Sequence, residues 1–355
     1  MSSYEFLVLT HMSTNQFKFL QWVDINKLDM RYISMNPKAI HFLEKNQEKI
    51  NWDNLCKYNK YAFRIIKNNL DKTNWSLLAG NPADEVYSLI RENVNKITNF
   101  NYLCCNTNSW INKIFDEFPY LIKKLNHQEM YNLCSNQTAL PTIEKHIDLI
   151  DWDALSKCSH AFHLLEKYPT KINFIELQMN NHPETYSLFM KCYDTSRIIV
   201  NLYISQSDCM VPFLKTYPTY IDSNICNNEN PDALELIRDY LLKNENDEMA
   251  WDYVSDNDIA INILENNVDH VNWTNVCTLT TPQAIKLIEN NLDKADWVTL
   301  SGNINAIHIL ENNLDKVVWK PLSGNINAIR ILENNLDKVD WKEVSQNYCI
   351  YDIVL

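Results

Sequence analysis

Apolar and polar residues follow one recurring pattern of about 22 residues along most of this chain. Residues 297–318 read WVTLSGNINAIHILENNLDKVV and residues 319–340 read WKPLSGNINAIRILENNLDKVD, which differ at four of 22 positions. The apolar positions fall in two groups, W-x-x-L and then A-I-x-I-L. In diverged copies the second group keeps the helical spacing i, i+3, i+4, as at Val86, Leu89 and Ile90. The pattern therefore predicts two short helices in each repeat.

A large residue, most often tryptophan, opens each repeat, and we call it the anchor residue. Fourteen anchors follow one another at a mean interval near 24 residues, and seven of the 13 intervals are 22 residues long. The anchors are Met30, Trp52, Trp75, Phe100, Met130, Trp152, Phe174, Val200, Asp222, Trp251, Trp273, Trp297, Trp319 and Trp341. Eight of the ten tryptophans are anchors, so we predict that these eight are structural residues of stacked repeats and not ligand contacts.

Polar residues at fixed places mark the ends of the predicted helices. Asp or Asn precedes the anchor in nine repeats, as N-caps of the first helix do: Asp29, Asn51, Asn74, Asn99, Asp151, Asn173, Asn272, Asp296 and Asp340. Asn stands six residues after the anchor in ten of 14 repeats. In two of them a proline follows it directly, Pro37 and Pro82, and Asn followed by Pro is typical of the N-cap and first residue of a helix, here the second helix of the repeat. The second helix ends at Asn-Asn, where we expect the left-handed cap conformation. Gly80, Gly302 and Gly324, each five residues after an anchor, are expected to turn with positive φ.

The fold predicted from this pattern is all-α, an α-solenoid of about 13 short helix-turn-helix repeats. A leucine-rich-repeat horseshoe is the alternative, because residues 304–314 also match L-x-x-L-x-L-x-x-N-x-L. We expect residues 30–347 to form a single array with an irregular middle at 100–250 and a regular part at 251–340. Residues 1–29 and 348–355 are then the N-terminal and C-terminal caps.

The repeat W-x-x-L-S-x-N-P-x-A-I-x-L-L-E-x-N-x-D-K resembles a known family. It is seen in SMNPKAIHFLEKN, AGNPADEVYSLIREN and LTTPQAIKLIENNLDKADW, and is similar to the tandem short repeats of giant amoeba-infecting DNA viruses of the mimivirus kind. The asparagine content, 48 of 355 residues, is similar to the biased composition of such AT-rich genomes. The resemblance implies an ankyrin-like helical array that binds proteins in the host cytoplasm, in the viral factory or the cytosol, and it brings no catalytic residues.

Composition narrows the possible functions. Three glycines, far apart, exclude phosphate-binding loops, and a net charge of -13 disfavours nucleic acid and anionic membranes as partners. Ten cysteines without a C-x-x-C pair indicate reduced thiols, so we expect no disulfide-linked partner. The segment MSSYEFLVLTHM has no basic n-region, so it does not read as a signal peptide, and we expect a protein that is not secreted.

Residues that could carry chemistry have simpler structural readings. Cys56, Cys104, Cys134, Cys226 and Cys277 all lie four residues after an anchor, in a slot that serine fills in other repeats, so we predict packing and no metal site. His160 and His163 are expected on a solvent-facing side of a helix. The recurring Asp-Lys pairs are expected to form ion pairs between repeats, because a catalytic carboxylate pair is normally assembled once. No catalytic, cofactor-binding or metal-binding residue is predicted.

A partner is expected at the irregular middle, where the anchor intervals 100–130, 174–200 and 222–251 are 30, 26 and 29 residues long. Aromatic residues gather there, and aromatic side chains are frequent interface anchors: Phe115, Phe118, Tyr120, Tyr193, Tyr203, Phe213, Tyr217 and Tyr220. Their alternative role is to replace leucine in a diverged core. Segment 229–248, with Glu235 and Asp239, is expected to present an acidic surface to a basic partner or to be a solvated helix face.

These observations favour a non-enzymatic scaffold or adaptor of a giant virus that binds a viral or host protein. The alternative is a structural scaffold subunit of a viral multiprotein assembly, such as a translation-initiation or transcription complex. Helical repeats can also bind single-stranded RNA at one base per repeat, but the charge of -13 and the absence of a recurring basic stripe disfavour this reading.

Overall fold

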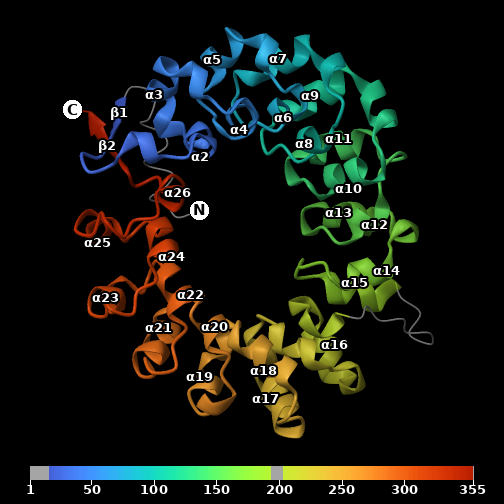
Figure 1. Ribbon diagram of the computed structural model, residues 1–355. Helices are drawn as coiled ribbons and strands as arrows, with labels where there is room; N and C mark the ends of the chain where they lie inside the picture. Colours follow the sequence, from blue (N-terminus) through green and yellow to red (C-terminus); the bar gives the residue numbers. More distant parts are fainter. Residues whose placement is uncertain (1–15, 193–202, 355) are drawn as a thin grey trace. The chain divides into compact units, whose positions relative to one another are not determined.

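The computed structural model describes residues 16–192 and 203–354. These residues form short helices that pack in chain order, and one two-stranded antiparallel sheet (Figure 1). The contacts divide the chain into two compact units, unit 1 with residues 1–108 and 304–355 and unit 2 with residues 109–303. The predicted α-solenoid of short repeats is confirmed. The leucine-rich alternative, which needs a strand in every repeat, is wrong, since the described residues contain only two strands.

The elements of each unit are short, mostly between three and ten residues. In unit 1 they are β1 (Gln16–Phe19), η1 (Ile25–Lys27), α2 (Met30–Met35), η2 (Pro37–Ala39), α3 (Ile40–Lys45), η3 (Gln47–Lys49), α4 (Trp52–Tyr58), α5 (Phe63–Lys67), η4 (Leu70–Lys72), α6 (Trp75–Leu78), α7 (Val86–Glu92), η5 (Val94–Lys96), α8 (Asn101–Cys104), α23 (Ile307–Glu311), α24 (Trp319–Gly324), α25 (Ile329–Glu333), α26 (Trp341–Val344) and β2 (Tyr351–Val354), where η marks a 3-10 helix. In unit 2 they are α9 (Trp110–Glu117), η6 (Pro119–Lys124), α10 (His127–Ser135), η7 (Gln137–Ala139), α11 (Leu140–Lys145), α12 (Trp152–Ser156), η8 (Ser159–Ala161), α13 (Phe162–Lys167), η9 (Pro169–Lys171), α14 (Phe174–Leu177), α15 (Thr185–Cys192), η11 (Ile204–Gln206), η12 (Asp208–Met210), α16 (Val211–Thr216), η13 (Pro218–Tyr220), η14 (Ser223–Asn227), η15 (Pro231–Ala233), α17 (Leu234–Lys243), α18 (Glu248–Ser255), η16 (Asp258–Ala260), α19 (Ile261–Leu264), η17 (Val268–His270), α20 (Trp273–Val276), α21 (Pro282–Glu289) and α22 (Trp297–Gly302).

The first helix of a repeat begins at the anchor residue in nine repeats: Met30, Trp52, Trp75, Trp152, Phe174, Trp273, Trp297, Trp319 and Trp341. Eight of the nine predicted N-caps are confirmed, because each side chain accepts a hydrogen bond from the first turn of its helix. The ninth, Asn99, accepts the same kind of bond from the Asn101 N–H at 2.9 Å, although Phe100 stands between it and the first residue of α8. Several repeats also carry a 3-10 helix at the L-D-K segment, for example η4, and this third element was not predicted.

The buried core includes the apolar residue three positions after most anchors, together with the apolar residues of the second helices. Leu55, Leu155 and Leu322 are all fully buried. Of the eight anchor tryptophans, Trp75 and Trp251 are buried, while the other six are only half-buried. The rings therefore cover the edge of the core more often than they fill it.

Buried asparagines join neighbouring repeats in what we call the asparagine ladder. The Asn81 side chain donates hydrogen bonds to the Cys56 carbonyl at 2.8 Å and the Asn59 carbonyl at 3.2 Å, both in the preceding repeat. Its oxygen accepts from the Ala83 backbone N–H at 3.0 Å. Equivalent donations to the preceding repeat come from Asn59, Asn106, Asn180, Asn228, Asn257, Asn303 and Asn347. The sequence predicted the capping bond that the side-chain oxygen accepts. It did not predict the donations from the side-chain amide to the preceding repeat.

The helix ends differ from the prediction, because no described residue has positive φ. Asn46 ends α3 with φ -130°, and its side-chain amide donates to the Phe42 carbonyl at 2.8 Å. Capping by the side chain thus replaces the expected left-handed conformation. Gly302 and Gly324 are the last residues of α22 and α24, so their predicted positive φ is also wrong.

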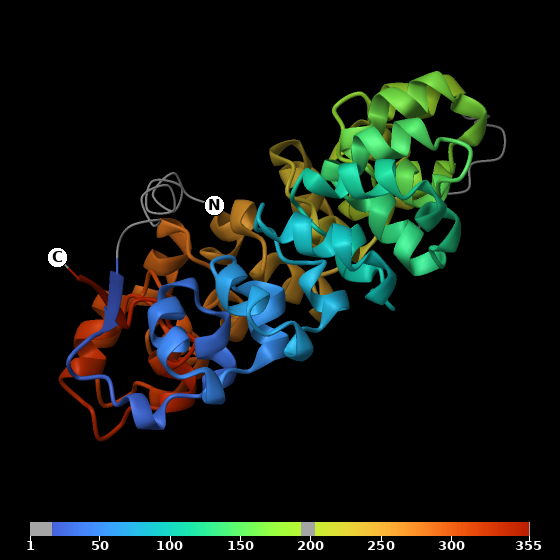
Figure 2. The ribbon, with the colours of Figure 1, turned by 90° about the horizontal axis from the view of Figure 1, so that it is seen from above.

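The two segments expected to be separate caps pair with each other inside unit 1. Strand β1 lies antiparallel to β2, with Phe17 opposite Ile353 and Phe19 opposite Tyr351. The Leu20 N–H donates to the Ile350 carbonyl at 2.9 Å and continues the pairing. Figures 1 and 2 both show the first repeats, in blue, beside the last repeats, in red. The first and last repeats of the array are therefore neighbours.

Candidate functional site

The candidate site lies at α17 in unit 2, within the predicted acidic segment. Helix α17 has ten residues, whereas the second helices of the regular repeats, α23 and α25, have five. The insertion in the anchor interval 222–251 thus adds a full turn of helix, and residues 244–247 return the chain to α18. Insertions of this kind give one place in a repeat array a surface that the other repeats lack.

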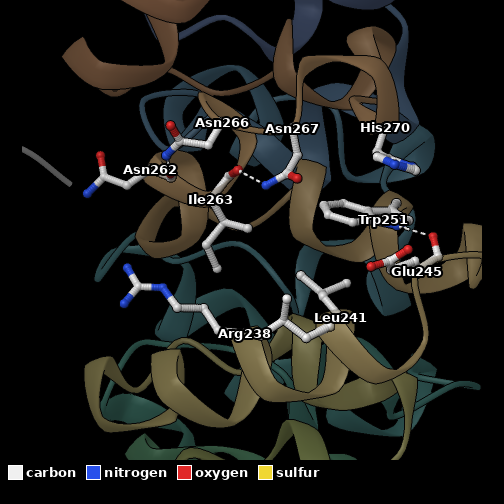
Figure 3. Close-up of a pocket in the computed structure, with 10 residues that line it drawn as sticks. Arg238, Leu241, Glu245, Trp251, Asn262, Ile263, Asn266, Asn267 and His270 are labelled. Carbon is white, nitrogen blue, oxygen red and sulfur yellow. Dashed lines mark hydrogen bonds between the residues drawn. The ribbon is translucent and has the colours of Figure 1, made fainter.

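A pocket of about 530 Å³ lies between α17 and the next second helix, α19. The α17 side contributes Arg238, Leu241 and Leu242, whose spacing i, i+3, i+4 places them on one helical face, and Glu245 from the loop that follows the helix. Figure 3 shows Arg238 and Leu241 opposite Ile263 from α19. Amide side chains complete the other wall, namely Asn262, Asn266 and Asn267.

One end of the pocket is closed by a fixed aromatic pair. The Trp251 indole N–H donates to the Glu245 carbonyl at 2.8 Å. The His270 ring stacks on Trp251 with centroids 4.5 Å apart and planes 15° apart (Figure 3). A volume of this size with both apolar and polar walls is within the range of protein binding pockets.

The loop before α18 is held by a buried hydrogen bond. Tyr240 donates its hydroxyl to the Asp247 carboxylate at 2.8 Å, and Asp247 also caps α18 by accepting from the Ala250 N–H at 3.2 Å. Burial and the bonded Asp247 raise the pKa of Tyr240 to about 12, so its proton stays in this hydrogen bond at neutral pH. Asp247 therefore links α17, through Tyr240, to the first turn of α18, through Ala250.

The exposed side of α17 and its flanks carries negative charge beside apolar side chains, and we call it the acidic surface. Its exposed carboxylates are Glu229, Asp232, Glu235, Asp239, Glu245 and Glu248. Only Arg238 and Lys243 oppose them on the helix. Leu242 is 72% exposed and Met249 is 55% exposed on the same surface. Large apolar side chains left this open beside a pocket are typical of interaction sites.

Two of the aromatic residues predicted to contact a partner lie in the core instead. Phe115 and Phe213 are fully buried, so they replace the leucine of a regular repeat. Tyr217 and Tyr220 pack against Phe213, with ring centroids 4.8 and 5.7 Å away. The partner role predicted for Phe115 and Phe213 is therefore wrong, because burial in the core removes the rings from any free surface.

The remaining predicted aromatics are spread over several places. Phe118 and Tyr120 form an edge-to-face pair with centroids 6.3 Å apart, and Tyr120 is 47% exposed. Tyr203 is 53% exposed. Tyr193 lies outside the described residues. Glu235 and Asp239 are exposed on α17, the helix that forms one wall of the pocket, although neither side chain lines the pocket itself.

The five cysteines assigned to packing are confirmed in that role. All of them are fully buried. Burial raises the pKa of Cys56 and Cys277 to about 11 and that of Cys134 and Cys226 to about 12. The thiols are therefore protonated at neutral pH and poor nucleophiles.

The two histidines do not share one solvent-facing side. His163 is exposed and lies 2.8 Å from the Glu144 carboxylate. His160 is half-buried, and burial lowers its pKa. The structure therefore corrects the prediction for His160, because of these two histidines His163 alone is exposed to solvent.

The lysines of the L-D-K segments contact tryptophan rings, which sequence reasoning missed. Lys72 lies 4.9 Å from the Trp52 ring centroid and Lys96 lies 4.9 Å from that of Trp75. Lys294 of another such segment lies 3.5 Å from the Asp269 carboxylate, which is an ion pair between repeats of the predicted kind. The signal that could have predicted the ring contact is the regular spacing of about 20 residues from tryptophan to lysine.

The fold and the site define an α-helical repeat protein with one irregular, acidic, pocket-bearing repeat. Among the described residues, no three His, Cys, Asp or Glu side chains are grouped so that they could hold a metal ion. None of the described helices has the length and the apolar character that crossing a membrane requires. Comparison with protein families, curated proteins and solved structures finds no match to this chain.

Proposed function

We propose that this protein is a non-enzymatic scaffold or adaptor that docks a basic partner segment on the acidic surface of α17. The observation that carries the proposal is Leu242, which is 72% exposed at the rim of the pocket, on a helix whose exposed residues include Glu235 and Asp239. Covering such a leucine contributes about 1.5–3 kcal/mol when it is fully buried. The partner therefore supplies an apolar side chain for the pocket and basic residues around it.

The charge of the acidic surface selects the partner and speeds its approach. Glu235 and Asp239 lie one turn apart on the exposed face of α17, so lysine or arginine on a partner helix can face both. Complementary charge raises association rates more than it raises affinity, and the effect weakens as salt is added. The apolar contact at Leu242 supplies the part of the affinity that salt does not screen.

The setting of this function rests on the family resemblance of the repeats. In that setting the protein acts in the host cytoplasm during infection by a giant virus, and its partner is a viral or a host protein. The regular repeats supply length, and the repeat that contains α17 supplies recognition.

Affinity capture from infected cells with matched variants tests the proposal. Leu242→Asp places a carboxylate at the rim of the pocket without touching the core. Val298→Asp is the control, because Val298 is 59% exposed on the regular helix α22 of the same unit. Wild type and Val298→Asp are expected to recover one stoichiometric partner that Leu242→Asp loses.

The outcome is decided by the difference between the variants. Equal recovery of the partner by all three proteins would show that recognition lies elsewhere in the array. Recovery of no stoichiometric protein by wild type would contradict the adaptor function itself. In 0.5 M salt we expect wild type and Val298→Asp to recover the partner less efficiently but not to lose it, because a Debye length of roughly 5 Å screens the surface charge and leaves the apolar contact at Leu242.

A further inference from the structure

A groove of about 500 Å³ lies in unit 1 between β1 and the second helix of the first repeat, and we call it the closing groove. The helical side contributes Lys38 from η2 and His41, Phe42 and Lys45 from α3. The opposite side consists of residues 17–21, Val23, Ile25 and Tyr351.

The closing groove exists because the last repeat has a strand where other repeats have a helix. In the preceding repeat α25 begins ten residues after Trp319, and in the last repeat β2 begins ten residues after Trp341. A two-stranded ribbon is thinner than a helix with its side chains. The ribbon β1–β2 therefore fills only part of the space that a second helix occupies, and α3 keeps an open face.

The charge of this groove is opposite to that of the protein. Lys18, Lys38, Lys45 and His41 line it, and no Asp or Glu does, in a chain with net charge -13. The remaining lining is largely apolar. Phe19 stands at its centre, 5.3 Å from the Phe42 ring and 4.7 Å from the Tyr351 ring.

Lys38 is the charged group that lacks an anion. It is half-buried, and its ammonium donates to the Tyr348 carbonyl at 2.9 Å and lies 5.6 Å from the Phe17 ring centroid. Among the described residues no carboxylate comes within 4.0 Å of it. Burial lowers the pKa of Lys38, since a neutral carbonyl and a ring do not replace the lost hydration of a full charge. An ammonium has three donors, so two remain for an anionic group.

We propose that the closing groove binds a small organic carboxylate with an apolar body, such as a medium-chain acyl or an aryl acid. Its carboxylate lies on Lys38, with Lys18 and Lys45 at the rim, and its body lies against Phe19, Phe42 and Tyr351. A volume of about 500 Å³ is of the size that holds one such molecule. This site is separate from the acidic surface of α17 and does not depend on the function proposed for it.

Isothermal titration calorimetry on the full chain with dodecanoate below its micellar concentration tests the site. Lys38→Met keeps the length of the side chain and removes its charge, while Lys38→Arg keeps the charge. Lys60→Met is the matched control, because Lys60 lies 5.1 Å from the Tyr61 ring in the next repeat and does not line the groove. The opposite-charge probe is dodecyltrimethylammonium, which has the same alkyl chain.

The expected result is saturable one-to-one binding of dodecanoate that Lys38→Met weakens by about tenfold or more, since a hydrogen bond to a charged group is lost. Lys38→Arg and Lys60→Met should stay within about threefold of wild type. The proposal is overturned if dodecanoate does not saturate, if the ammonium probe binds equally, or if Lys38→Met binds dodecanoate as wild type does. Thermal unfolding of each variant, followed by circular dichroism, shows that the fold is retained.

Discussion

Two junctions in unit 1 use the same serine contact, although only one of them follows the chain. At the internal junction between the repeats that begin at Trp319 and Trp341, the Asp340 N–H donates to the Ser323 hydroxyl at 2.9 Å. At the closing junction between the last repeat and the first, the Asp29 N–H donates to the Ser345 hydroxyl at 2.8 Å. The first repeat thus stacks on the last as though it were the next one.

The lysine–tryptophan contact is shared in the same way. Lys338 lies 4.8 Å from the Trp319 ring at the internal junction, and Lys27 lies 5.2 Å from the Trp341 ring at the closing junction. The 3-10 helix η1, which carries Lys27, therefore takes the part that η4 and its equivalents play between consecutive repeats.

The asparagine ladder separates the two junctions. Asn347 donates to the Asn325 carbonyl at 3.1 Å across the internal junction. At the closing junction the equivalent side chain, that of Asn36, shows among the described residues its capping bond from the Lys38 N–H at 3.0 Å and no donation to the last repeat. Pairing of β1 with β2 replaces the missing rung. The comparison teaches that stacking is encoded in the surface of each repeat, whereas a junction without chain continuity needs an added strand pair.

The largest effect is expected from removing the strand that only the closing junction has. Deletion of residues 348–355 removes β2 and two buried side chains, Ile350, which is fully buried, and Tyr351, which is 8% exposed. We expect the free energy of unfolding to fall by about 3–6 kcal/mol, from the burial of two large apolar side chains. Urea unfolding measures it, with Tyr348→Ala as control, because Tyr348 is 57% exposed. An unchanged midpoint after the deletion would show that the strand pair adds nothing.

The next effect is expected at the ladder, where the two junctions differ. Asn81→Ala removes a cap and leaves the Cys56 and Asn59 carbonyls without their donor, so we expect a loss of about 3 kcal/mol. Asn36→Ala removes a cap alone, so about 1 kcal/mol is expected. Urea unfolding of both variants under the same conditions compares them. Equal losses would mean that the ladder donations contribute little.

A smaller and equal effect is expected where the two junctions agree. Ser323→Ala and Ser345→Ala each leave one backbone N–H without an acceptor, at Asp340 and Asp29 respectively. We expect each variant to lose about 1–2 kcal/mol, and the two losses to match within about 0.5 kcal/mol. Chemical unfolding checks this, and a negligible loss for Ser345→Ala alone would contradict stacking at the closing junction.

The smallest effect is expected from the cation–π contacts. Lys27→Met and Lys338→Met keep the side-chain length and remove the charge over Trp341 and Trp319. Each is expected to lower stability by about 0.5 kcal/mol, the value of an exposed cation–π contact. Thermal unfolding of each single variant, of Trp341→Leu and Trp319→Leu, and of the double variants Lys27→Met with Trp341→Leu and Lys338→Met with Trp319→Leu gives the coupling energy of each lysine–tryptophan pair. A coupling energy for Lys338 but none for Lys27 would show that the lysine–tryptophan contact stabilises the internal junction and not the closing one.

Much of each repeat could be predicted from the sequence, because its signals are local. Eight N-caps and nine helix starts follow from an Asp or Asn beside a large apolar residue. The buried cysteines follow from their position in a slot that serine also fills. The capping geometry of Asn46 could not be predicted, since its side chain satisfies the helix end as well as a left-handed backbone does.

The candidate site was predicted only in part. The insertion and the negative charge of segment 229–248 pointed to α17, but the pocket depends on Ile263 and Trp251, which read as ordinary repeat residues. Phe115 and Phe213 were misassigned, because an aromatic residue in a diverged repeat fits a core and an interface equally well in sequence. Burial depends on what packs against the ring, and composition alone does not contain that information.

The sequence by itself determined the repeat, its two helices and their caps, because each of these rests on residues only a few positions apart. The tertiary structure alone decided that Ser345 meets Asp29, that β1 pairs with β2 and that Lys38 faces a groove without an acid. These contacts join residues about 300 positions apart. Their formation depends on side-chain packing between residues far apart in the chain, which no local motif contains.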